Sequence, residues 1–584
     1  MANKLELTWV GKEEEIRIEP RILVENPALS NMSKCVSKMG QTSIFDEPAV
    51  DNFDNMLIHG DNLLALKALE SKYAGKVKCI YIDPPYNTGS AFEHYDDNLE
   101  HSIWLNLMKE RINILWNLLS ADGLLAVQID DNEYARLFLL MCEVCREQNL
   151  KTICVKMSEA TGVKMASVNK AGSIPKLKEY IILAKKDGIK NLDLERVPKE
   201  KWDREYKTYC SNISDNDLIK IKDILNKEET VKEEVDFVDN MLKKIVFLNI
   251  NDVAIQETGS PATDEWCFAN ANRIVQFATL TGGARDIAIQ KKMSLSDKLP
   301  SAFSIRTKKG KMYAIRADFN TETKLSRCKI LFADQYLTVN PGDLWTDIKT
   351  TGLDNEGCVE FQKSKKPERL IRRIIRLNTK VNDIVLDSFL GSGTTAAVAH
   401  KMGRRWIGVE MGDHAYTHCK FRLDKVIEGE QGGISKSLKW KGGGGYRFYE
   451  LAPSLVVEDK FGNPIINKEY NADMLSAAMA LHEGFTYAPD DTCYWKQGKN
   501  ENAYIFTTTN HITADYLASI DAEMQNGEYL VICCKTYDAG IEKLYKNISI
   551  KKIPQVLLGR CEFGKDDYSL NIVDIPTMED EDEE

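Results

Sequence analysis

The feature of this sequence that most constrains its fold is an alternation of strand and helix patterns that occurs in two separate blocks. In residues 56–150, the strand patterns DNMLIH, VKCIYID and GLLAVQID alternate with runs of helical apolar spacing. Residues 341–440 show the same alternation, with a helix beginning near Pro367 and the strand patterns DIVLD and RRWIGVE. Buried strands that alternate with helices are typical of a parallel sheet covered on both faces. We therefore predict that the two blocks form one doubly wound α/β sheet.

The interval between the blocks, residues 151–340, is far longer than a loop. Connections in compact domains usually have about 4–6 residues, so we expect this interval to form an inserted domain. The expected parts of the 584-residue chain are an N-terminal segment at 1–55, core blocks at 56–150 and 341–440, the inserted domain at 151–340, a C-terminal domain at 441–577 and an acidic tail at 578–584. The glycine run KGGGGY at 441–446 is expected to act as a flexible hinge, and the tail is expected to be disordered.

The composition is that of an ordinary soluble globular protein, with 43% hydrophobic and 28% charged residues. No stretch approaches the roughly 20 apolar residues of a membrane span, and the start MANKLELTWVGKEEE lacks the apolar centre of a signal peptide. We therefore expect a cytoplasmic protein without a membrane partner. The 14 cysteines are scattered, which favours reduced thiols. Cys142 and Cys145 have CxxC spacing in the apolar run LFLLMCEVC, where buried helix thiols are favoured over zinc, so we expect no metal.

The loop between the strand DIVLD and the next helix has the composition of a cofactor-binding turn. A glycine-rich turn in this context lets the backbone approach a nucleotide-like ligand, and an acid at the end of the next strand can accept hydrogen bonds from ribose hydroxyls. Glu410 occupies that position, 19 residues after Gly391. The spacing of Gly391, Gly393 and Ala396 also fits a dinucleotide enzyme or a purely structural turn. The candidate cofactor-binding residues of the loop are Asp387, Phe389, Gly391, Gly393 and Thr394.

A second candidate site follows the strand VKCIYID, at Asp83, Pro84, Pro85 and Tyr86. The Asp83 carboxylate and the Pro84 carbonyl are two acceptors for the hydrogens of an exocyclic amine, and Tyr86 can stack on a planar base. Holding both hydrogens turns the nitrogen lone pair out of the base plane, toward an electrophilic methyl group. The structural alternative is a stiff Pro-Pro turn that closes a strand.

These motifs resemble those of amino-group DNA methyltransferases that use S-adenosylmethionine. DPPY at 83–86 looks like their catalytic motif, DSFLGSGTT at 387–395 like their cofactor motif, and Glu410 like their ribose-binding acid. The resemblance implies that Lys366, Pro367 and Glu368 cap the methionine end of the cofactor. The DPPY block comes first, which is the order of the beta class. This order implies a circularly permuted Rossmann-like sheet with an inserted target-recognition domain.

A more specific resemblance is to the modification (Mod) subunits of type III restriction-modification systems. It covers LELTWVGKEEE, EPRIL, HGDNLLALKAL, DPPYNTGSAFEHYDDN, GDLWTDI and the extension beginning near GGGGYRFYEL. The resemblance implies methylation of adenine N6 in double-stranded DNA after base flipping, a homodimer, and a restriction (Res) subunit as partner or an orphan methylase. It also implies that Asp61 lies near the adenine of the cofactor. The sequence has no GxxxxGK[ST] phosphate loop, so cleavage would require a separate subunit.

Three other functions share some of these features. A nicotinamide dehydrogenase accounts for the glycine loop but not for DPPYNTG or KPE. A methyltransferase acting on cytosine, RNA or a protein amide uses the same chemistry. A non-catalytic DNA-binding scaffold keeps the fold, although Asp83 and the glycines are intact here.

The net charge of −11 does not exclude DNA, because six acids occupy 579–584 and removing them leaves −5. Basic residues cluster at 291–329 and 361–380, where they can bind phosphate or form a solvated face. The candidate DNA contacts are Lys308, Lys309, Lys311, Tyr313 and Arg316. The arginines at 372, 373 and 376 fall on the polar side of the helix after KPE, where solvent exposure is the simple expectation.

Overall fold

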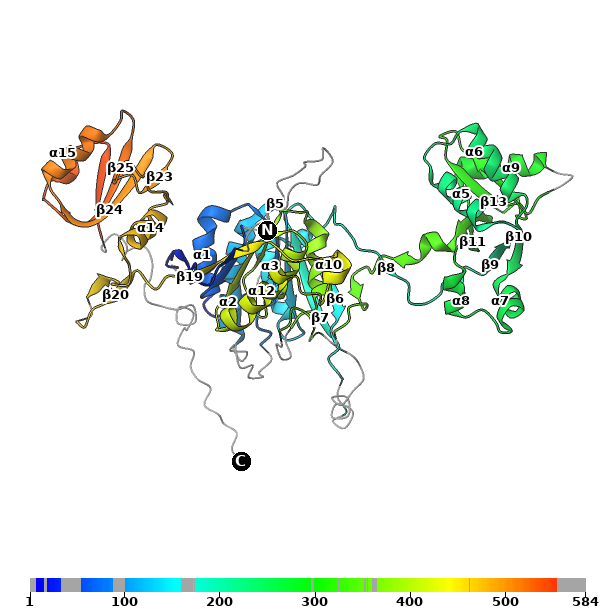
Figure 1. Cartoon of the computed structure of the whole chain (residues 1–584), viewed down its shortest axis with the longest axis horizontal. Coiled ribbons are helices and arrows are strands. Elements are labelled where there is room, and N and C mark those ends of the chain that lie inside the picture. The colour runs from blue at the N-terminus through cyan, green and yellow to red at the C-terminus, as the bar shows by residue number, and fades with distance from the viewer. Residues whose placement is uncertain are drawn as a thin grey trace. The chain divides into compact units, whose positions relative to one another are not determined.

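The computed structural model divides into two compact units, Met1–Glu195 with Gly342–Glu584, and Arg196–Pro341 (Figure 1). The residues whose structure is described are 7–14, 18–32, 54–87, 100–158, 172, 174–295, 299–323, 325–350, 353, 355–359, 365–461 and 463–553. The acidic tail at 578–584 lies outside them.

The first unit is built on an 11-stranded sheet in the order β1-β19-β3-β18-β17-β4-β5-β7-β6-β16, with β2 paired to β19. Strands β3, β18, β17, β4 and β5 are parallel neighbours. The direct pairing of β17 with β4 confirms that the two sequence blocks complete one α/β sheet. The strands are β1 (Leu23–Glu25), β2 (Asn31–Met32), β3 (Met56–His59), β4 (Val77–Ile82), β5 (Leu119–Ile129), β6 (Leu150–Lys156), β7 (Lys178–Lys185), β16 (Leu344–Trp345), β17 (Ile384–Asp387), β18 (Arg405–Glu410) and β19 (Gly445–Leu451).

Both faces of this sheet are buried under helices, which explains why its central strands β3, β4 and β17 are mostly apolar. Successive side chains of a strand point to opposite faces. In β4, Ile80 and Ile82 pack with α1, α2 and α3, whereas Cys79 and Tyr81 pack with α10, α11 and α12. The helical elements are α1 (Asn62–Tyr73), α2 (His101–Leu118), α3 (Tyr134–Cys145), η1 (Glu147–Asn149), α10 (Glu368–Asn378), α11 (Thr394–Lys401), the π-helix η3 (Ala415–Lys420), α12 (Phe421–Glu428) and α13 (Ser435–Leu438). The helix predicted near Pro367 is confirmed as α10.

The two candidate loops leave the sheet at the same edge. Asp387 ends β17, and Asp83 directly follows β4. The strands are in register, with Val385 opposite Cys79 and Leu386 opposite Ile80. Open α/β sheets bind ligands outside the carboxyl ends of their strands. The sheet therefore brings together two loops that are about 300 residues apart in the sequence.

The second unit begins later than the sequence predicts. Residues 151–185 were expected in the inserted domain, but β6 and β7 belong to the large sheet and the second unit starts at Arg196. The physical reason is that β7 runs antiparallel to both β5 and β6, so this segment interrupts the strand-helix alternation that marks the core blocks. The second unit ends at Pro341.

The second unit has its own sheet and its own apolar clusters, as expected of an inserted domain. Its antiparallel sheet has the order β10-β9-β11-β14-β13-β12. The strands are β8 (Val197–Pro198), β9 (Thr208–Ser211), β10 (Val246–Asn249), β11 (Ile274–Thr279), β12 (Ala302–Arg306), β13 (Met312–Arg316), β14 (Arg327–Phe332) and β15 (Thr338–Val339). The helices are α5 (Asp215–Asn226), α6 (Lys232–Leu242), α7 (Ile250–Thr258), α8 (Asp264–Ala269), α9 (Gly282–Ser294) and η2 (Ala333–Tyr336).

The glycine run at 441–446 does not form the hinge that the sequence suggests. A Cβ on Gly442 would lie 2.5 Å from the carbonyl oxygen of Ile427, so glycine is needed for close packing against the end of α12. The chain then enters β19, where Tyr446 and Phe448 are fully buried. The run therefore leads from α13 into β19, which lies between β1 and β3 in the large sheet.

The C-terminal region after β19 contains a separate five-stranded sheet in the order β22-β23-β24-β25-β26. Its elements are β20 (Val456–Glu458), β21 (Pro464–Ile466), α14 (Ala472–His482), β22 (Thr486–Tyr487), β23 (Gly498–Asn500), β24 (Ala503–Ile512), α15 (Ala514–Glu523), β25 (Tyr529–Tyr537), η4 (Ile541–Lys543) and β26 (Ile548–Lys552). The buried carboxylate of Glu19 accepts hydrogen bonds from the Leu455 amide at 2.7 Å and from the Ser454 hydroxyl at 2.9 Å. The N-terminal segment therefore fixes the start of this region.

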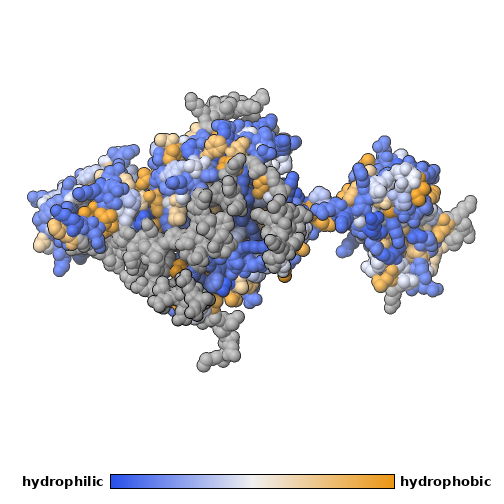
Figure 2. Space-filling model, turned by 90° about the horizontal axis from the view of Figure 1, so that it is seen from below, coloured by the Kyte–Doolittle hydropathy of each residue, from blue (hydrophilic) through white to orange (hydrophobic). Residues whose placement is uncertain are grey.

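Among the residues that Figure 2 colours, hydrophilic ones predominate, with apolar residues scattered among them. Such scattering is normal for a protein surface. Among the described residues, no helix combines the length and apolar character that crossing a membrane requires. In the same part of the chain, no group of His, Cys, Asp and Glu has the arrangement of a metal site.

Candidate active site

The glycine loop between β17 and α11 has two glycines with different tasks. Gly391 (φ 54°) and Gly393 (φ 77°) both lie in the left-handed region, which favours glycine. A Cβ on Gly393 would lie 3.2 Å from the Cα of Cys419, so this glycine permits close packing against η3. A Cβ on Gly391 would meet no protein atom within 4 Å. The backbone at Gly391 therefore faces open space that a ligand can fill.

Glu410 lies at the end of β18 and is bound to the glycine loop. Its buried carboxylate accepts hydrogen bonds from the amides of Gly391 at 2.7 Å and Gly412 at 3.1 Å. A carboxylate offers about four lone-pair positions, so it can still accept from ligand hydroxyls. A pocket of about 350 Å³, including space open to solvent, is lined by Asn62, Pro85, Leu107, Arg111, Ser388, Phe389, Glu410 and Met411. It combines apolar walls with a few polar groups, as small-molecule sites do.

Asp387 holds the start of the glycine loop. Its carboxylate accepts a hydrogen bond from the Phe389 amide at 2.9 Å. Burial raises the pKa of Asp387 to about 7, and the nearby carboxylates of Asp83 and Glu410 act in the same direction. Asp387 therefore orders the loop, and Phe389 of the same loop lines the pocket.

The DPPY segment at 83–86 is held from several sides. The Pro85 carbonyl accepts a hydrogen bond from the indole of the fully buried Trp104 in α2, at 2.9 Å. Asn87, which follows the motif, has a φ of 56° and donates to Glu133 at 2.7 Å. The Tyr86 hydroxyl lies 2.6 Å from Oδ1 of Asp83. These contacts fix the DPPY loop relative to α2 and to the start of α3, whose N-cap is Glu133.

Two charged residues beside the DPPY segment complete a partly buried cluster. The Lys366 ammonium lies 3.1 Å from Oδ2 of Asp83 and 2.8 Å from the Tyr86 hydroxyl. Glu179, in β7, lies 2.8 Å from the Tyr86 hydroxyl and 3.3 Å from Lys366, and it accepts a hydrogen bond from Gln128. Sequence reasoning missed Glu179, because its strand was assigned to the inserted domain. Asp83, Tyr86, Glu179 and Lys366 form what we call the Asp83 cluster.

The electrostatics of the Asp83 cluster favour a charged lysine and a neutral tyrosine. Burial raises the pKa of Asp83, with Lys366 opposing this and Glu179 adding to it. Burial also raises the pKa of Tyr86 well above its ordinary value, so the hydroxyl keeps its proton. Although burial alone would lower it, the pKa of Lys366 is raised because Asp83 and Glu179 lie beside it. Despite burial, Lys366 and hydrogen bonds hold the pKa of Glu179 below its ordinary value.

Comparison with known proteins identifies the family. The model of the DNA methylase family (N6_N4_Mtase) matches residues 77–421, which is more than half of the chain. This chain belongs to that family of DNA methylases. The match runs from β4 through the second unit to the end of η3, and so covers most of both core blocks.

Two curated relatives of this methylase have similar descriptions. It is 35% identical over 420 residues to a "Probable type III restriction-modification enzyme HindVI Mod subunit" of Haemophilus influenzae, a match that covers 68% of this chain and 54% of the relative. It is 28% identical over 387 residues to the "Type III restriction-modification enzyme EcoPI Mod subunit" of Escherichia phage P1, covering 60% and 55%. The chain thus spans about half the length of these relatives. Among solved structures, the crystal structure of the M1.HpyAVI-SAM complex matches with 14% identity and a TM-score of 0.30, over 63% of this chain and 99% of that one.

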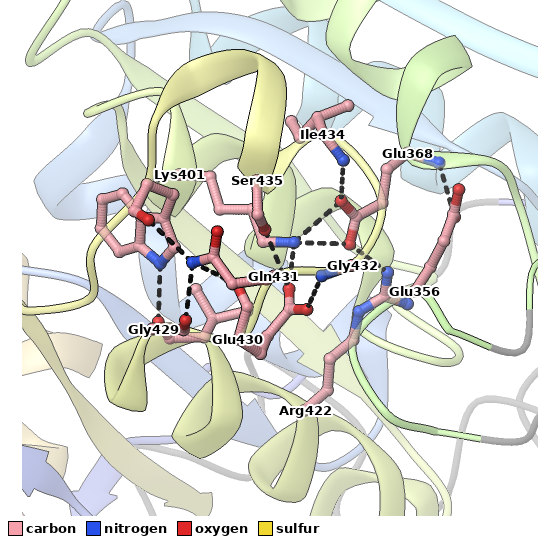
Figure 3. Close-up of polar contacts among 12 residues, drawn as sticks. Glu356, Glu368, Lys401, Arg422, Gly429, Glu430, Gln431, Gly432, Ile434 and Ser435 are labelled. Atoms are coloured by element: carbon pink, nitrogen blue, oxygen red, sulfur yellow. Dashed lines mark hydrogen bonds and ion pairs between the residues drawn. The ribbon is translucent and has the colours of Figure 1, made fainter.

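The three residues of the KPE segment make different contacts in the methylase core. Lys366 joins the Asp83 cluster, and Pro367 is the N-cap of α10. The Glu368 carboxylate is completely buried, where it pairs with Lys401 and Arg422, both at 2.8 Å (Figure 3). These pairs give the carboxylate a structural role, and its expected contact with a cofactor stays a prediction.

Asp61 has a capping role in the methylase core. Its carboxylate is the N-cap of α1 and accepts a hydrogen bond from the Leu64 amide at 3.0 Å. The next residue, Asn62, lines the pocket and donates to the Ser388 carbonyl at 2.8 Å. Arg111 in turn donates to Asn62 at 2.6 Å. Sequence reasoning missed Asn62 and Arg111, which connect the DPPY block to the glycine loop.

Some of the candidate DNA contacts of the methylase are exposed, whereas others contact groups of the protein itself. Lys308 and Lys309 are exposed in the turn between β12 and β13. In contrast, Arg316 pairs with Asp318 at 2.6 Å, and Lys311 lies 3.3 Å from the Lys227 carbonyl. The ammonium of Lys329 lies 4.9 Å from the centre of the Tyr313 ring. Only the two turn lysines of this set project freely, and their DNA contact stays a prediction.

The arginines of α10 form ion pairs within the protein, which corrects the expectation that they lie on a solvent-exposed face. Arg373 is buried and pairs with Asp347 at 2.6 Å and with Glu195 at 3.2 Å. Arg372 also pairs with Glu195, at 2.9 Å. Arg376 pairs with Asp193 at 2.9 Å. These arginines fix the segment just before the second unit to α10.

Proposed function

We propose that this chain is a site-specific DNA adenine-N6 methyltransferase that uses S-adenosylmethionine. We further propose that it is the modification subunit of a type III restriction-modification system, or an orphan relative of one. In this proposal the chain acts in the cytoplasm as a homodimer on double-stranded DNA, and a Res subunit supplies any cleavage. The second unit, residues 196–341, is the proposed target-recognition domain. The descriptions of the two Mod relatives support these assignments.

One observation carries the proposal: Pro85 of the DPPY segment lines the same pocket as Phe389 and Glu410 of the second block. A methyltransferase must place the target amine next to the cofactor, and this pocket is where the two motifs meet. The open space at Gly391 and the carboxylate of Glu410 fit a nucleoside with ribose hydroxyls. When bound, S-adenosylmethionine supplies an electrophilic methyl group on a sulfonium.

The residues of the chain then act on the target base. A base flipped out of the duplex stacks on Tyr86, as flipped bases do on aromatic side chains. Asp83 and the Pro84 carbonyl accept the two hydrogens of its amine, which leaves the nitrogen lone pair free to point at the methyl group. The rate gain comes from this positioning, and no covalent bond to the enzyme is required. The buried Asp83 carboxylate lies where the amine loses its proton after transfer.

The decisive experiment incubates the purified chain with isotope-labelled S-adenosylmethionine and mixed-sequence duplex DNA. Nucleoside mass spectrometry and methylation-sensitive sequencing then identify the product and its site. We expect N6-methyladenine in one strand of a short asymmetric site. N4-methylcytosine as the sole product would refute the adenine assignment, and cofactor binding without any methylated nucleoside would refute the chain as sufficient for the reaction. A nicotinamide cofactor that raises the melting temperature in place of S-adenosylmethionine would favour a dehydrogenase.

A further inference from the structure

Both oxygens of the Asp83 carboxylate are already occupied by groups of the protein. The Tyr86 hydroxyl lies 2.6 Å from Oδ1, and the Lys366 ammonium lies 3.1 Å from Oδ2. A carboxylate offers about four lone-pair positions, so a target amine can donate to Asp83 as a third donor and shares the carboxylate charge with both groups. Another partner for these donors therefore leaves more of that charge to the amine.

Glu179 is that second partner for both donors. Its Oε2 lies 2.8 Å from the Tyr86 hydroxyl and 3.3 Å from the Lys366 ammonium. The hydroxyl has one proton, and Lys366 donates to its oxygen at 2.8 Å, so the proton can serve either Asp83 or Glu179. Rotation of the O–H bond moves the proton from one carboxylate to the other. The aromatic ring does not have to move, and its stacking surface is preserved.

The position of Glu179 is fixed from the far side of the cluster. The amide of Gln128 donates to the same Oε2, and the carbonyl of Gln128 accepts a hydrogen bond from the buried Tyr81 hydroxyl at 2.7 Å. The Glu179 side chain is only 17% exposed. A charged acceptor that is held rigidly competes well for a proton, because hydrogen bonds to ionised groups are roughly twice as strong as neutral ones.

We infer that Glu179 is a positioning residue for methyl transfer, because it takes the Tyr86 hydroxyl and the Lys366 ammonium when the target amine binds to Asp83. This inference rests on the proposed function. The titratable and charged groups that face Asp83 are Tyr81 on β4, Tyr86 on its own loop, Glu179 on β7, Lys366 before α10 and Asp387 on β17. Glu179 supplies one of the two negative charges that surround the single ammonium.

The test replaces Glu179 by the isosteric glutamine and measures single-turnover methyl transfer with saturating S-adenosylmethionine. The glutamine side chain is a neutral acceptor, so Asp83 retains the Tyr86 proton more often, and we expect the rate to fall about tenfold. We also expect the acid limb of the pH-rate profile to move to lower pH, because the Glu179 charge raises the pKa of Asp83. The control is Glu428→Gln at an exposed pair with Lys425, which should leave rate and profile unchanged.

A double-mutant cycle with Tyr86→Phe isolates the hydroxyl. Tyr86→Phe keeps the ring but removes the proton that Glu179 must take, so Glu179→Gln should cost less than about threefold in that background. An undiminished tenfold loss in the Tyr86→Phe background would overturn the inference. So would an unchanged rate and pH profile in the Glu179→Gln protein, provided that the wild type methylates DNA. If the wild type yields no methylated DNA, the proposed function fails instead.

Cofactor affinity and melting temperature of each variant report on folding. If Glu179→Gln does not fold, Glu179→Asp is the second variant, because it keeps the charge but moves the carboxylate away from the Tyr86 hydroxyl. Its rate should also fall about tenfold while its acid limb stays near that of the wild type. A wild-type rate in Glu179→Asp would contradict the inference.

Discussion

The completely buried carboxylate of Glu368 provides a sharp test of what the KPE segment does. Its oxygens lie 2.8 Å from the ammonium of Lys401 and 2.8 Å from the guanidinium of Arg422, and the Ile434 amide donates to it at 3.1 Å (Figure 3). Lys401 also pairs with Glu430. Two buried cations therefore depend on Glu368, and both have zero side-chain exposure.

The substitution Glu368→Gln removes the charge without creating a cavity. Breaking one partner of a buried ion pair costs about 3–5 kcal/mol, because the remaining charges stay buried without compensation. The amide still accepts one hydrogen bond, so we expect the lower end of this range, a loss of about 3 kcal/mol in the free energy of unfolding. Glu430 continues to compensate Lys401, and the main electrostatic cost falls on Arg422.

The assay is denaturant unfolding followed by tryptophan fluorescence and circular dichroism, with calorimetric titration of S-adenosylmethionine into the folded variant. We expect a lower unfolding midpoint with an unchanged slope, and a cofactor dissociation constant within about threefold of the wild type. Glu428→Gln serves as the exposed control and should change neither quantity. Normal stability together with lost cofactor affinity would refute the reasoning and restore Glu368 as a cofactor ligand.

Four further predictions concern the two candidate sites and the second unit. Asp83→Ala should reduce methyl transfer at least about 1,000-fold while sparing cofactor affinity, because it removes only the acceptor for the target amine, as rate and titration measurements will show. Gly391→Val should weaken cofactor binding at least about tenfold, because it places a branched side chain in the open space with a φ of 54°; tight binding by the folded variant would contradict this. The raised pKa of Asp387, about 7, means that its ionisation opposes folding as the pH rises from its ordinary pKa toward 7, so Asp387→Asn should stabilise the protein by about 2–3 kcal/mol more at pH 8 than at pH 5 in denaturant unfolding. The double substitution Lys308→Ala and Lys309→Ala should weaken DNA binding and reduce the slope of log affinity against log salt by about 2, whereas an unchanged slope would exclude these lysines as phosphate contacts.

The sequence predicts much of the catalytic core because its signals are local. The strand before Asp83 is a short apolar run, and the turn at Gly391 needs glycine for its backbone conformation. Both the apolar run and the glycine are visible in a single sequence. The neighbouring positions of these loops also follow from a general rule, since ligands bind at the carboxyl ends of parallel strands. The structure confirms that Asp83 follows β4 and that β4 pairs with the strand ending at Asp387.

The remaining parts depend on pairings between distant segments, which local patterns do not report. β7 joins the large sheet by antiparallel pairing with β5 and β6, and its sequence EYIILAK has the appearance of any buried strand. For this reason Glu179 was assigned to the inserted domain. The ion pairs of Glu368 could not be predicted for a related reason: its partners Lys401 and Arg422 come from other helices, and only the folded core shows that they surround it.

The Asp83 cluster also links catalysis to the assembly of the fold. Asp83, Glu179 and Lys366 come from segments before, within and after the strand pair that leads to the second unit, and each is costly to bury alone. Both carboxylates stabilise the ammonium, as the raised pKa of Lys366 indicates. A chain in which β7 has not yet paired with β5 therefore lacks one of the two charges that balance Lys366. The Asp83 carboxylate therefore has this environment only when the two core blocks and the β6–β7 pair have come together.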